Sequence, residues 1–427
     1  MTSVVATNQT ILVVGGGISG MTAALEAAET GKQVVLVEKN PYLGGRTVQL
    51  YRYFPKMCHP TCGLEINLRR LKANPRIQVL TMAEVTGISG AKGDYSVSVK
   101  LAPRFVNENC TACGECNKAA TTEIDDAFNY NLGKVKAAYL PNDMAYPQRY
   151  VIDPSVVGTA EGQAIKAACK YSAVDLDMKE EVVTLNAGAI VWATGWQPYD
   201  AAKITPYRYG EFKNVITNVE FERLADPHGP TGGKILRPSD GKEARNVAFI
   251  QCAGSRDENH LRHCSRFCCM ASLKQTRYVD EAFGADGKST IYYIDIRAID
   301  RFEDFYQQVQ ANPNVSFVKS KVARITEDKN GDPRLWGVNT EGYIRYAEPH
   351  DLVVLAVGME PSVKNVAIPI EVLGDSSGFV MADPANGGIF GAGCATNALD
   401  VNRAVQSATA AALGAVQVVS KVARGEA

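Results

Sequence analysis

A strand-like run, a glycine-rich turn and a helix-like run near the N-terminus constrain the fold of this chain more than any other feature. The apolar run Thr10 to Val14 leads into Gly15-Gly16-Gly17-Ile18-Ser19-Gly20, and MTAALEAAETG follows. This is GxGxxG in the context of a dinucleotide-binding βαβ unit, where the helix N-terminus receives a pyrophosphate and the glycines allow a tight turn and close backbone approach. The cofactor contacts expected here are Gly15, Gly17, Ser19 and Gly20.

A second strand, Gln33 to Val37, ends in an acidic residue, Glu38. A carboxylate at this position can accept hydrogen bonds from a ribose. The chain continues as EKNPYLGGR, which resembles the EKxxxxGGR segment of FAD-binding flavoproteins with two dinucleotide-binding domains. FAD is therefore preferred over NAD. The contacts expected in this segment are Glu38, Lys39, Gly44, Gly45 and Arg46.

Two later stretches also resemble these flavoproteins. AIVWATG, ending at Gly195, is similar to their ATG strand, and GIFGAGC, ending at Cys394, is similar to their C-terminal GD motif. Cys394 replaces the usual Asp, so only its backbone N–H can make that contact. A helix-like stretch from Asp400 to about Val419 would direct its positive end towards the flavin. The remaining expected contacts are Val85, Thr194, Gly195, Gly393 and Cys394.

Four cysteines follow the strand-like run Asn246 to Ile250, in QCAGSRDENHLRHCSRFCCM. Thiolates from one loop and one helical turn can each bind one iron of a cubane cluster. An adjacent Cys268-Cys269 pair is a poor disulfide, and structural zinc sites favour CxxC knuckles that this segment lacks. Nearby arginines, Arg256 among them, would offset the negative charge of a cluster. A 4Fe-4S cluster is expected at Cys252, Cys264, Cys268 and Cys269, with structural zinc or inert buried thiols as alternatives.

A second group of cysteines matches one half of a bacterial ferredoxin repeat. Cys110, Cys113 and Cys116 fit CxxCxxC, but the fourth position of that motif is Ala120. In two-cluster ferredoxins the fourth cysteine of each motif ligates the other cluster, and Cys169 supplies one. One complete set thus remains, while the opposite set, at Ala120, Thr159, Gly162 and Ile165, is absent. Two interpretations of these cysteines remain: they hold a second cluster, or they are structural thiols of a ferredoxin motif that no longer binds one.

Two further features concern other redox chemistry. Cys58 and Cys62, in KMCHPTCG, resemble the redox-active dithiol of lipoamide-dehydrogenase-like enzymes, although ordinary loop thiols are an alternative. A thioredoxin-reductase-like flavoprotein would carry a second GxGxxG for NADPH where this chain has QCAGSR. Because Cys252 replaces the first glycine, no NAD(P)H is expected to bind there.

Taken together, these segments resemble the A subunits of heterodisulfide reductases along nearly the whole chain. QCAGSRDE and HCSRFCCM are the most diagnostic parts. The resemblance implies FAD on a thioredoxin-reductase-like core, a 4Fe-4S cluster on Cys252, Cys264, Cys268 and Cys269, partner subunits and a homodimer. The missing ferredoxin cysteines suggest a short form like that of sulfur-oxidising bacteria, working in sulfur-compound oxidation.

Composition agrees with a redox protein. Lys plus Arg number 45 and Asp plus Glu 46, so charge gives no reason to propose nucleic acid as a partner. The start MTSVVATNQT lacks the features of a signal peptide, and no apolar run is long enough to span a membrane. We therefore expect a cytoplasmic protein without membrane insertion. Eleven cysteines then favour metal or redox chemistry over a disulfide scaffold.

The expected fold class is α/β, with two doubly wound, thioredoxin-reductase-like dinucleotide-binding domains and a degenerate ferredoxin-like insertion. The boundaries expected are 1–103 for the first part of the FAD domain, 104–180 for the insertion, 181–244 for the second part and connection, 245–350 for a second Rossmann-like domain with the iron-sulfur motif, and 351–427 for the third part.

The leading functional prediction is an oxidoreductase subunit that passes electrons between flavin, cluster and partner subunits; no catalytic residue is assigned. Two alternatives remain: a stand-alone flavin-disulfide oxidoreductase using Cys58 and Cys62, and a non-catalytic assembly scaffold. Rapid bleaching of the flavin by NADH would favour the first of these alternatives.

Overall fold

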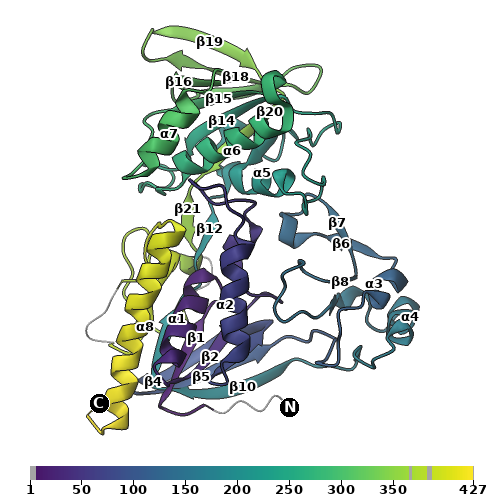
Figure 1. Cartoon of the computed structure of the whole chain (residues 1–427), viewed down its shortest axis with the longest axis vertical. Helices are drawn as coiled ribbons and strands as arrows, with labels where there is room; N and C mark the ends of the chain where they lie inside the picture. Colours follow the sequence, from purple (N-terminus) through teal and green to yellow (C-terminus); the bar gives the residue numbers. More distant parts are fainter. Residues whose placement is uncertain (1–5, 365–367, 382–386, 427) are drawn as a thin grey trace. The chain divides into compact units, whose positions relative to one another are not determined.

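The chain folds into two compact units (Figure 1). The computed structural model describes residues 6–364, 368–381 and 387–426, so the first five residues of the N-terminal segment MTSVVATNQT lie outside it. Unit 1 comprises Met1–Val48, Thr61–Trp196 and Pro361–Ala427, and unit 2 comprises Gln49–Pro60 and Gln197–Glu360.

Unit 1 is built on a five-stranded parallel sheet in the order β22-β11-β1-β2-β3. Its strands are β1 (Thr10–Val14), β2 (Gln33–Glu38), β3 (Ile77–Thr81), β11 (Ala189–Trp192) and β22 (Ile389–Gly391). β1 and β11 are buried along their whole length, as expected of parallel strands covered on both faces. The strands predicted from Thr10 and Gln33 are confirmed.

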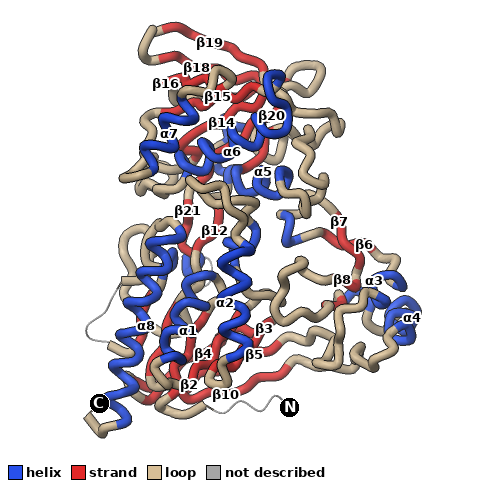
Figure 2. The backbone as a smooth tube through the Cα atoms, in the orientation of Figure 1, coloured by secondary structure: helices blue, strands red, loops and turns tan. Residues whose placement is uncertain are grey.

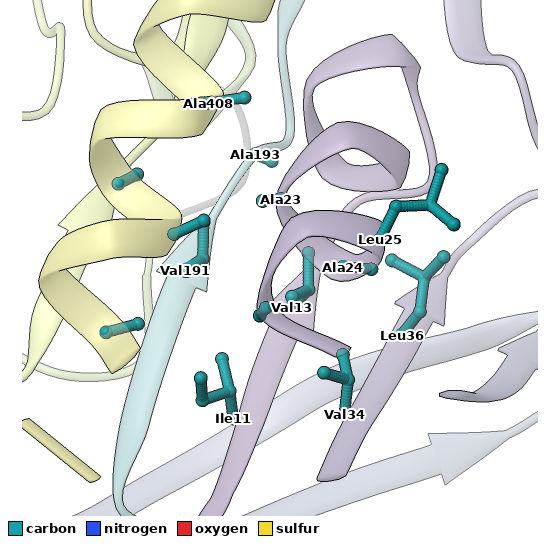
Figure 3. Close-up of a cluster of buried hydrophobic side chains, with 14 of the residues drawn as sticks. Ile11, Val13, Ala23, Ala24, Leu25, Val34, Leu36, Val191, Ala193 and Ala408 are labelled. Atoms are coloured by element: carbon teal, nitrogen blue, oxygen red, sulfur yellow. The ribbon is translucent and has the colours of Figure 1, made fainter. Parts of the chain in front are cut away.

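Helices cover one face of this sheet: α1 (Ile18–Glu29), α2 (Thr61–Ala73) and α8 (Val401–Ala423). Alternate strand residues such as Ile11, Val13 and Val191 point into this layer, where Ala23 and Ala408 allow close helix packing (Figure 3). No helix among the described residues, α8 included, is long and apolar enough to cross a bilayer.

The opposite face packs on a three-stranded antiparallel sheet in the order β10-β5-β4. Its strands are β4 (Ala83–Ala91), β5 (Asp94–Leu101) and β10 (Glu181–Ala187). Residues 102–180 form an insertion between β5 and β10. These two strands are paired antiparallel, with Leu101 opposite Glu181 at one end and Tyr95 opposite Ala187 at the other. The chain therefore leaves and re-enters the sheet at neighbouring positions.

The insertion has a small core of its own, which includes Phe105, Ile152 and Ile165. Two short antiparallel ribbons and two short helices surround it (Figure 2). The elements are α3 (Glu115–Ala119), β6 (Glu123–Asp125), β7 (Lys134–Lys136), β8 (Ala138–Tyr139), β9 (Val151–Ile152) and α4 (Ala160–Ala168).

Unit 2 contains a second five-stranded parallel sheet, in the order β13-β20-β14-β15-β16, and an antiparallel sheet β17-β18-β19. The parallel strands are β13 (Val215–Thr217), β14 (Asn246–Ala253), β15 (Lys288–Tyr293), β16 (Val315–Lys319) and β20 (Leu352–Val357). The antiparallel strands are β17 (Arg324–Glu327), β18 (Pro333–Asn339) and β19 (Ile344–Pro349). The helices are α5 (Asn218–Ala225), α6 (Cys268–Phe283) and α7 (Phe302–Gln310). Two parallel sheets confirm the expected α/β fold class.

The unit boundaries differ from those expected for the FAD domain. The chain crosses between units after Trp196 and after Glu360, within the short paired strands β12 (Trp196–Pro198) and β21 (Met359–Pro361). Residues 197–244 and 351–360 thus belong to unit 2, because the fully apolar strand β20 pairs between β13 and β14. Sequence pattern identifies β20 as a buried strand without indicating which sheet receives it.

Candidate functional site

The turn between β1 and α1 forms an open cradle of backbone. Gly15 has φ +105°, and a Cβ there would lie 2.4 Å from the Ala193 carbonyl oxygen. A Cβ on Gly17, in contrast, would meet only the Gly45 Cα, at 3.9 Å. The space above Gly17 is therefore available to a ligand, as the GxGxxG pattern predicts.

The N-terminus of α1 faces this space without a capping side chain. Gly17 is the N-cap residue and has no side chain that could cap the helix. The Met21 N–H donates the first hydrogen bond of the helix to the Gly17 carbonyl at 2.9 Å. Amides of the first helical turn can therefore bind an anion such as pyrophosphate. Ser19, expected as a contact, donates its hydroxyl to the Ala404 carbonyl at 3.3 Å.

Glu38 at the end of β2 braces the cradle. Its Oε2 accepts the Gly16 N–H at 2.5 Å and its Oε1 accepts the Asn40 N–H at 2.7 Å. Burial raises the pKa of this carboxyl, and the backbone hydrogen bonds oppose that rise. Because a carboxylate has about four acceptor sites, capacity remains for a ribose hydroxyl. Lys39 lies on the surface and pairs with Glu84 at 3.6 Å.

The second glycine pair closes one side of the cradle. The Gly44 N–H donates to the Gly16 carbonyl at 2.9 Å. Arg46 then donates through Nε to the Trp196 carbonyl at 2.7 Å and through Nη1 to the Tyr130 hydroxyl at 3.0 Å. The predicted contact Arg46 thus ties the glycine loop to Trp196 and to the insertion, and no sequence motif indicates Tyr130 as its partner.

The ATG strand contributes a hydroxyl that the protein leaves unused. The Thr194 Oγ1 is shielded from solvent and has no hydrogen-bond partner among the described residues. Gly195 follows with φ +70° and open space where a Cβ would stand. A polar atom without a partner is costly, so Thr194 fits a site that a polar ligand completes. Val85, in contrast, is buried in the core between the two sheets.

The C-terminal motif returns to the first turn of α1. Gly393 has φ +61°, and a Cβ there would lie 1.9 Å from the Ser19 Oγ. Cys394 is buried, its Sγ donates to the Leu399 carbonyl at 3.4 Å, and burial raises its pKa to about 11. Asp400 caps α8 by accepting the Arg403 N–H at 3.0 Å, which confirms the predicted helix start. The cradle, the open Gly17 and the Thr194 hydroxyl together fit FAD.

The structure brings the four cysteines of unit 2 to the wall of one small pocket, here called the unit 2 cysteine cavity. Cys252 lies near the end of β14 with φ +57°, Cys264 lies on the following loop, and Cys268 and Cys269 begin α6. The four cysteines are thus supplied by one strand end, one loop and one helix N-terminus.

Backbone N–H groups donate to two of these sulfurs, Cys264 and Cys269, although burial has the largest effect on the pKa of Cys269. The Arg266 N–H donates to the Cys264 Sγ at 3.4 Å. Burial raises the pKa of Cys269 to about 12, and a backbone hydrogen bond from Arg297 opposes that rise. Such thiols ionise when a metal replaces the proton, so the cavity is suited to a bound group rather than to a reactive thiolate.

A second small pocket lies in the insertion and is here called the unit 1 cysteine cavity. It joins Cys110, Cys113 and Cys116 to Cys169, the C-cap residue of α4. The Ala112 N–H donates to the Cys110 Sγ at 3.5 Å and the Ala173 N–H to the Cys169 Sγ at 3.3 Å. Each of the two cavities is therefore lined by four thiols of its own, and in each of them backbone N–H groups donate hydrogen bonds to sulfur.

The four positions of the opposite ferredoxin set have structural roles. Thr159 caps α4 by accepting the Gly162 N–H at 3.1 Å, and a Cβ on Gly162 would lie 2.3 Å from the Val156 carbonyl oxygen. Ile165 and Ala120 are completely buried in the core of the insertion. The residues at these four positions cap a helix or pack in the core, whereas the residues of the other set are all cysteines.

Within residues 6–364, 368–381 and 387–426, no group of three or more His, Cys, Asp or Glu side chains converges closely enough to hold a single metal ion. The thiols of both cavities instead surround a space. This arrangement suits a multinuclear group, in which each thiolate binds a different iron. Cys58, in unit 2, and Cys62, in α2 of unit 1, are both exposed.

The fold and the glycine cradle have counterparts in known flavoproteins. The family described as FAD dependent oxidoreductase matches residues 10–69. The thioredoxin reductases from T. acidophilum and Lactococcus lactis share the fold with TM-scores of 0.53, at 13% and 14% sequence identity, over 98% and 97% of this chain and 100% and 99% of theirs. The thioredoxin-reductase-like fold expected from the sequence is confirmed.

Curated relatives match the chain at higher identity. The A subunit of the Ferredoxin/F(420)H(2)-dependent CoB-CoM heterodisulfide reductase of Methanosarcina acetivorans is 36% identical over 96% of this chain and 53% of its own length. The second iron-sulfur A subunit of the CoB-CoM heterodisulfide reductase of Methanopyrus kandleri is 35% identical over 96% of this chain and 64% of its own length. The chain thus spans between about half and two thirds of these relatives.

Proposed function

This chain is an oxidoreductase homologous over nearly its whole length to heterodisulfide reductase A subunits, and on that premise we propose that it is the FAD- and 4Fe-4S-containing electron-transfer subunit of a heterodisulfide-reductase-like complex. The observation that carries the proposal is a four-thiol cavity in a flavoprotein fold whose expected second nucleotide motif is replaced by cysteine. Bound FAD exchanges electrons in pairs or singly, and an iron–sulfur cluster exchanges them singly.

The residues of unit 1 would hold FAD by three kinds of contact. The α1 N-terminus and the open backbone at Gly17 receive the pyrophosphate. Glu38 offers its remaining acceptor sites to a ribose. Thr194 offers its shielded hydroxyl to a polar atom of the cofactor.

The residues of unit 2 would hold one 4Fe-4S cluster through Cys252, Cys264, Cys268 and Cys269. Adjacent cysteines at the start of α6 project from successive positions of a helix, so each can bind a different iron. Burial raises the pKa of Cys268 well above its usual value, so the thiol keeps its proton when no metal is bound. A bound cluster would replace that proton and hold the sulfur as a thiolate.

A second 4Fe-4S cluster is proposed at Cys110, Cys113, Cys116 and Cys169. The supporting observation is that Cys169, distant in sequence, completes the cavity formed by the CxxCxxC triplet. The conversion of the opposite set to capping and core residues explains why one cluster is proposed here rather than two.

The test is iron and acid-labile sulfide per flavin in protein purified without oxygen. We expect about eight irons per FAD, because each 4Fe-4S cluster carries four. C268A and C169A should each lose about four while keeping FAD. C62A, which alters an exposed cysteine, is the matched control. Four irons that C169A leaves unchanged would exclude the second cluster, and the absence of iron would refute the whole proposal.

The partners proposed are other subunits of a heterodisulfide-reductase-like complex, which would hold the thiol or disulfide chemistry. The process proposed is sulfur-compound oxidation in the cytoplasm. Purification of the tagged chain from sulfur-oxidising cells should recover further iron–sulfur subunits in fixed stoichiometry. Recovery of the chain alone would contradict this assignment.

A homodimer of the chain is proposed from the resemblance to heterodisulfide reductase A subunits. Light scattering of the FAD-loaded protein should give twice the chain mass of 46.1 kDa. A mass near that of one chain across the dilution series would overturn the proposal.

A further inference from the structure

The lining of the unit 2 cysteine cavity carries charge as well as thiols. Arg256, Arg266, Arg297 and Asp295 all line it. Arg266 and Arg297 reach sulfur through backbone N–H groups. Arg256 is different, because its guanidinium is the group that acts on a thiol. Burial raises the pKa of Cys252, and the charge of Arg256 and its hydrogen bond to this thiol oppose the rise.

Backbone geometry and an ion pair hold Arg256 at the cavity wall. The residue has φ +58°, and its N–H donates to the His263 carbonyl at 3.2 Å. Its Nη1 donates to the Asp295 Oδ1 at 2.6 Å, and the Arg256 side chain is 24% exposed. Arg297 donates Nε to the same oxygen at 3.4 Å. Asp295 therefore fixes the guanidinium in one place.

We propose that the Arg256–Asp295 ion pair at the wall of the unit 2 cysteine cavity sets the reduction potential of the cluster held there, with the Arg256 charge raising the potential and the Asp295 charge lowering it. The inference rests on the proposed cluster site. Reduction adds one negative charge to a group that already carries thiolate charge, so a fixed cation and an N–H donor to sulfur stabilise the reduced state and raise the potential.

The sign of the effect distinguishes the two residues. Loss of the Arg256 charge should lower the midpoint potential, whereas loss of the Asp295 charge should raise it, because Asp295 is the negative member of the pair. A hydrogen bond to a charged group has an effect of about tenfold or more in an equilibrium. A tenfold change in a one-electron equilibrium corresponds to about 59 mV.

The experiment is a potentiometric titration of the FAD-loaded protein, with the cluster followed by electron paramagnetic resonance. We expect R256Q to lower the midpoint by about 59 mV, R256K to lower it less because the charge is kept, and D295N to raise it. R262Q is the matched control, since Arg262 is exposed on the same loop and does not line the cavity. Iron and FAD contents of every variant report cluster occupancy and folding.

Unchanged midpoints in R256Q and D295N, at full iron content, would overturn the inference while leaving the cluster assignment intact. If R256Q fails to retain its cluster, the midpoint potentials of D295N and R256K test the inference instead. A higher midpoint in D295N and a lower one in R256K would support it, and unchanged midpoints in both variants would overturn it. Absence of a cluster from the parent protein would instead refute the proposed function.

Discussion

Single residues show where the protein leaves its own polar groups for a ligand. Glu38 uses two carboxylate positions on backbone N–H groups, whereas the Thr194 hydroxyl is shielded from solvent and has no partner within the described part of the chain. A shielded hydroxyl without a partner is unfavourable in the unliganded protein and becomes favourable when a ligand supplies the missing atom. The Thr194 hydroxyl should therefore strengthen FAD binding while it lowers the stability of the apoprotein.

Replacement of Thr194 by Val tests this opposition. T194V should weaken FAD binding by about fivefold to tenfold, corresponding to a lost hydrogen bond of about 1 kcal/mol. The thermal stability of the apoprotein should not fall, because no existing hydrogen bond is removed. Fluorescence titration with FAD and thermal unfolding of the apoprotein measure the two quantities.

Thr22 on α1 provides the matched control, because its hydroxyl already donates to the Ile18 carbonyl at 2.8 Å. T22V should leave the FAD affinity near that of the parent. Equal affinities of T194V and the parent would show that the Thr194 hydroxyl does not contact the cofactor.

Elements, rather than single residues, build the cradle. The ends of β1, β2 and β11 meet the first turn of α1 near Gly15, where the Gly15 N–H donates to the Val37 carbonyl at 2.8 Å and the Ala193 N–H donates to the Val14 carbonyl at 2.7 Å. No side chain can enter this junction because the Ala193 carbonyl oxygen occupies the space. The tight turn is therefore a property of four elements packed together.

Alanine substitutions at the two ends of α1 separate strain from steric blockage. Gly15 and Gly31 both have positive φ, +105° and +90°, but only Gly15 has atoms within reach of a new Cβ. Both G15A and G31A should lose stability through backbone strain of about 1–2 kcal/mol. Only G15A should also lose FAD, measured as flavin per protein after gel filtration. Full flavin content in G15A would contradict the assignment of the cradle.

At the scale of the whole molecule, the described residues form two five-stranded parallel sheets, and among those residues only unit 1 has an open glycine cradle where a strand meets a helix. In unit 2 the end of β14 carries Cys252, and a Cβ on Gly254, just after the strand, would lie 2.4 Å from the Tyr199 ring. The Tyr199 ring thus covers the backbone where a second pyrophosphate would approach. In flavoproteins with two dinucleotide-binding domains, the second domain binds a nicotinamide cofactor. In this chain the corresponding unit has cysteines at that position.

Stopped-flow mixing with NADH tests this difference between the units. We expect no rapid loss of flavin absorbance, because unit 2 offers no open glycine turn for a second dinucleotide at β14. Dithionite, which needs no binding site, should reduce the same sample fully and serves as the control. Bleaching by NADH within the first seconds would favour the stand-alone flavin-disulfide oxidoreductase using Cys58 and Cys62.

The sequence by itself determined the α/β class, the GxGxxG turn and the start of α8, because these depend on local patterns: an apolar strand, a glycine turn and an Asp cap. It also selected both sets of four cysteines. Only the tertiary structure decided that β20 joins unit 2 and that Tyr130 holds Arg46. The physical reason is that such contacts join residues far apart in the chain, and long-range packing leaves no local pattern from which they can be predicted.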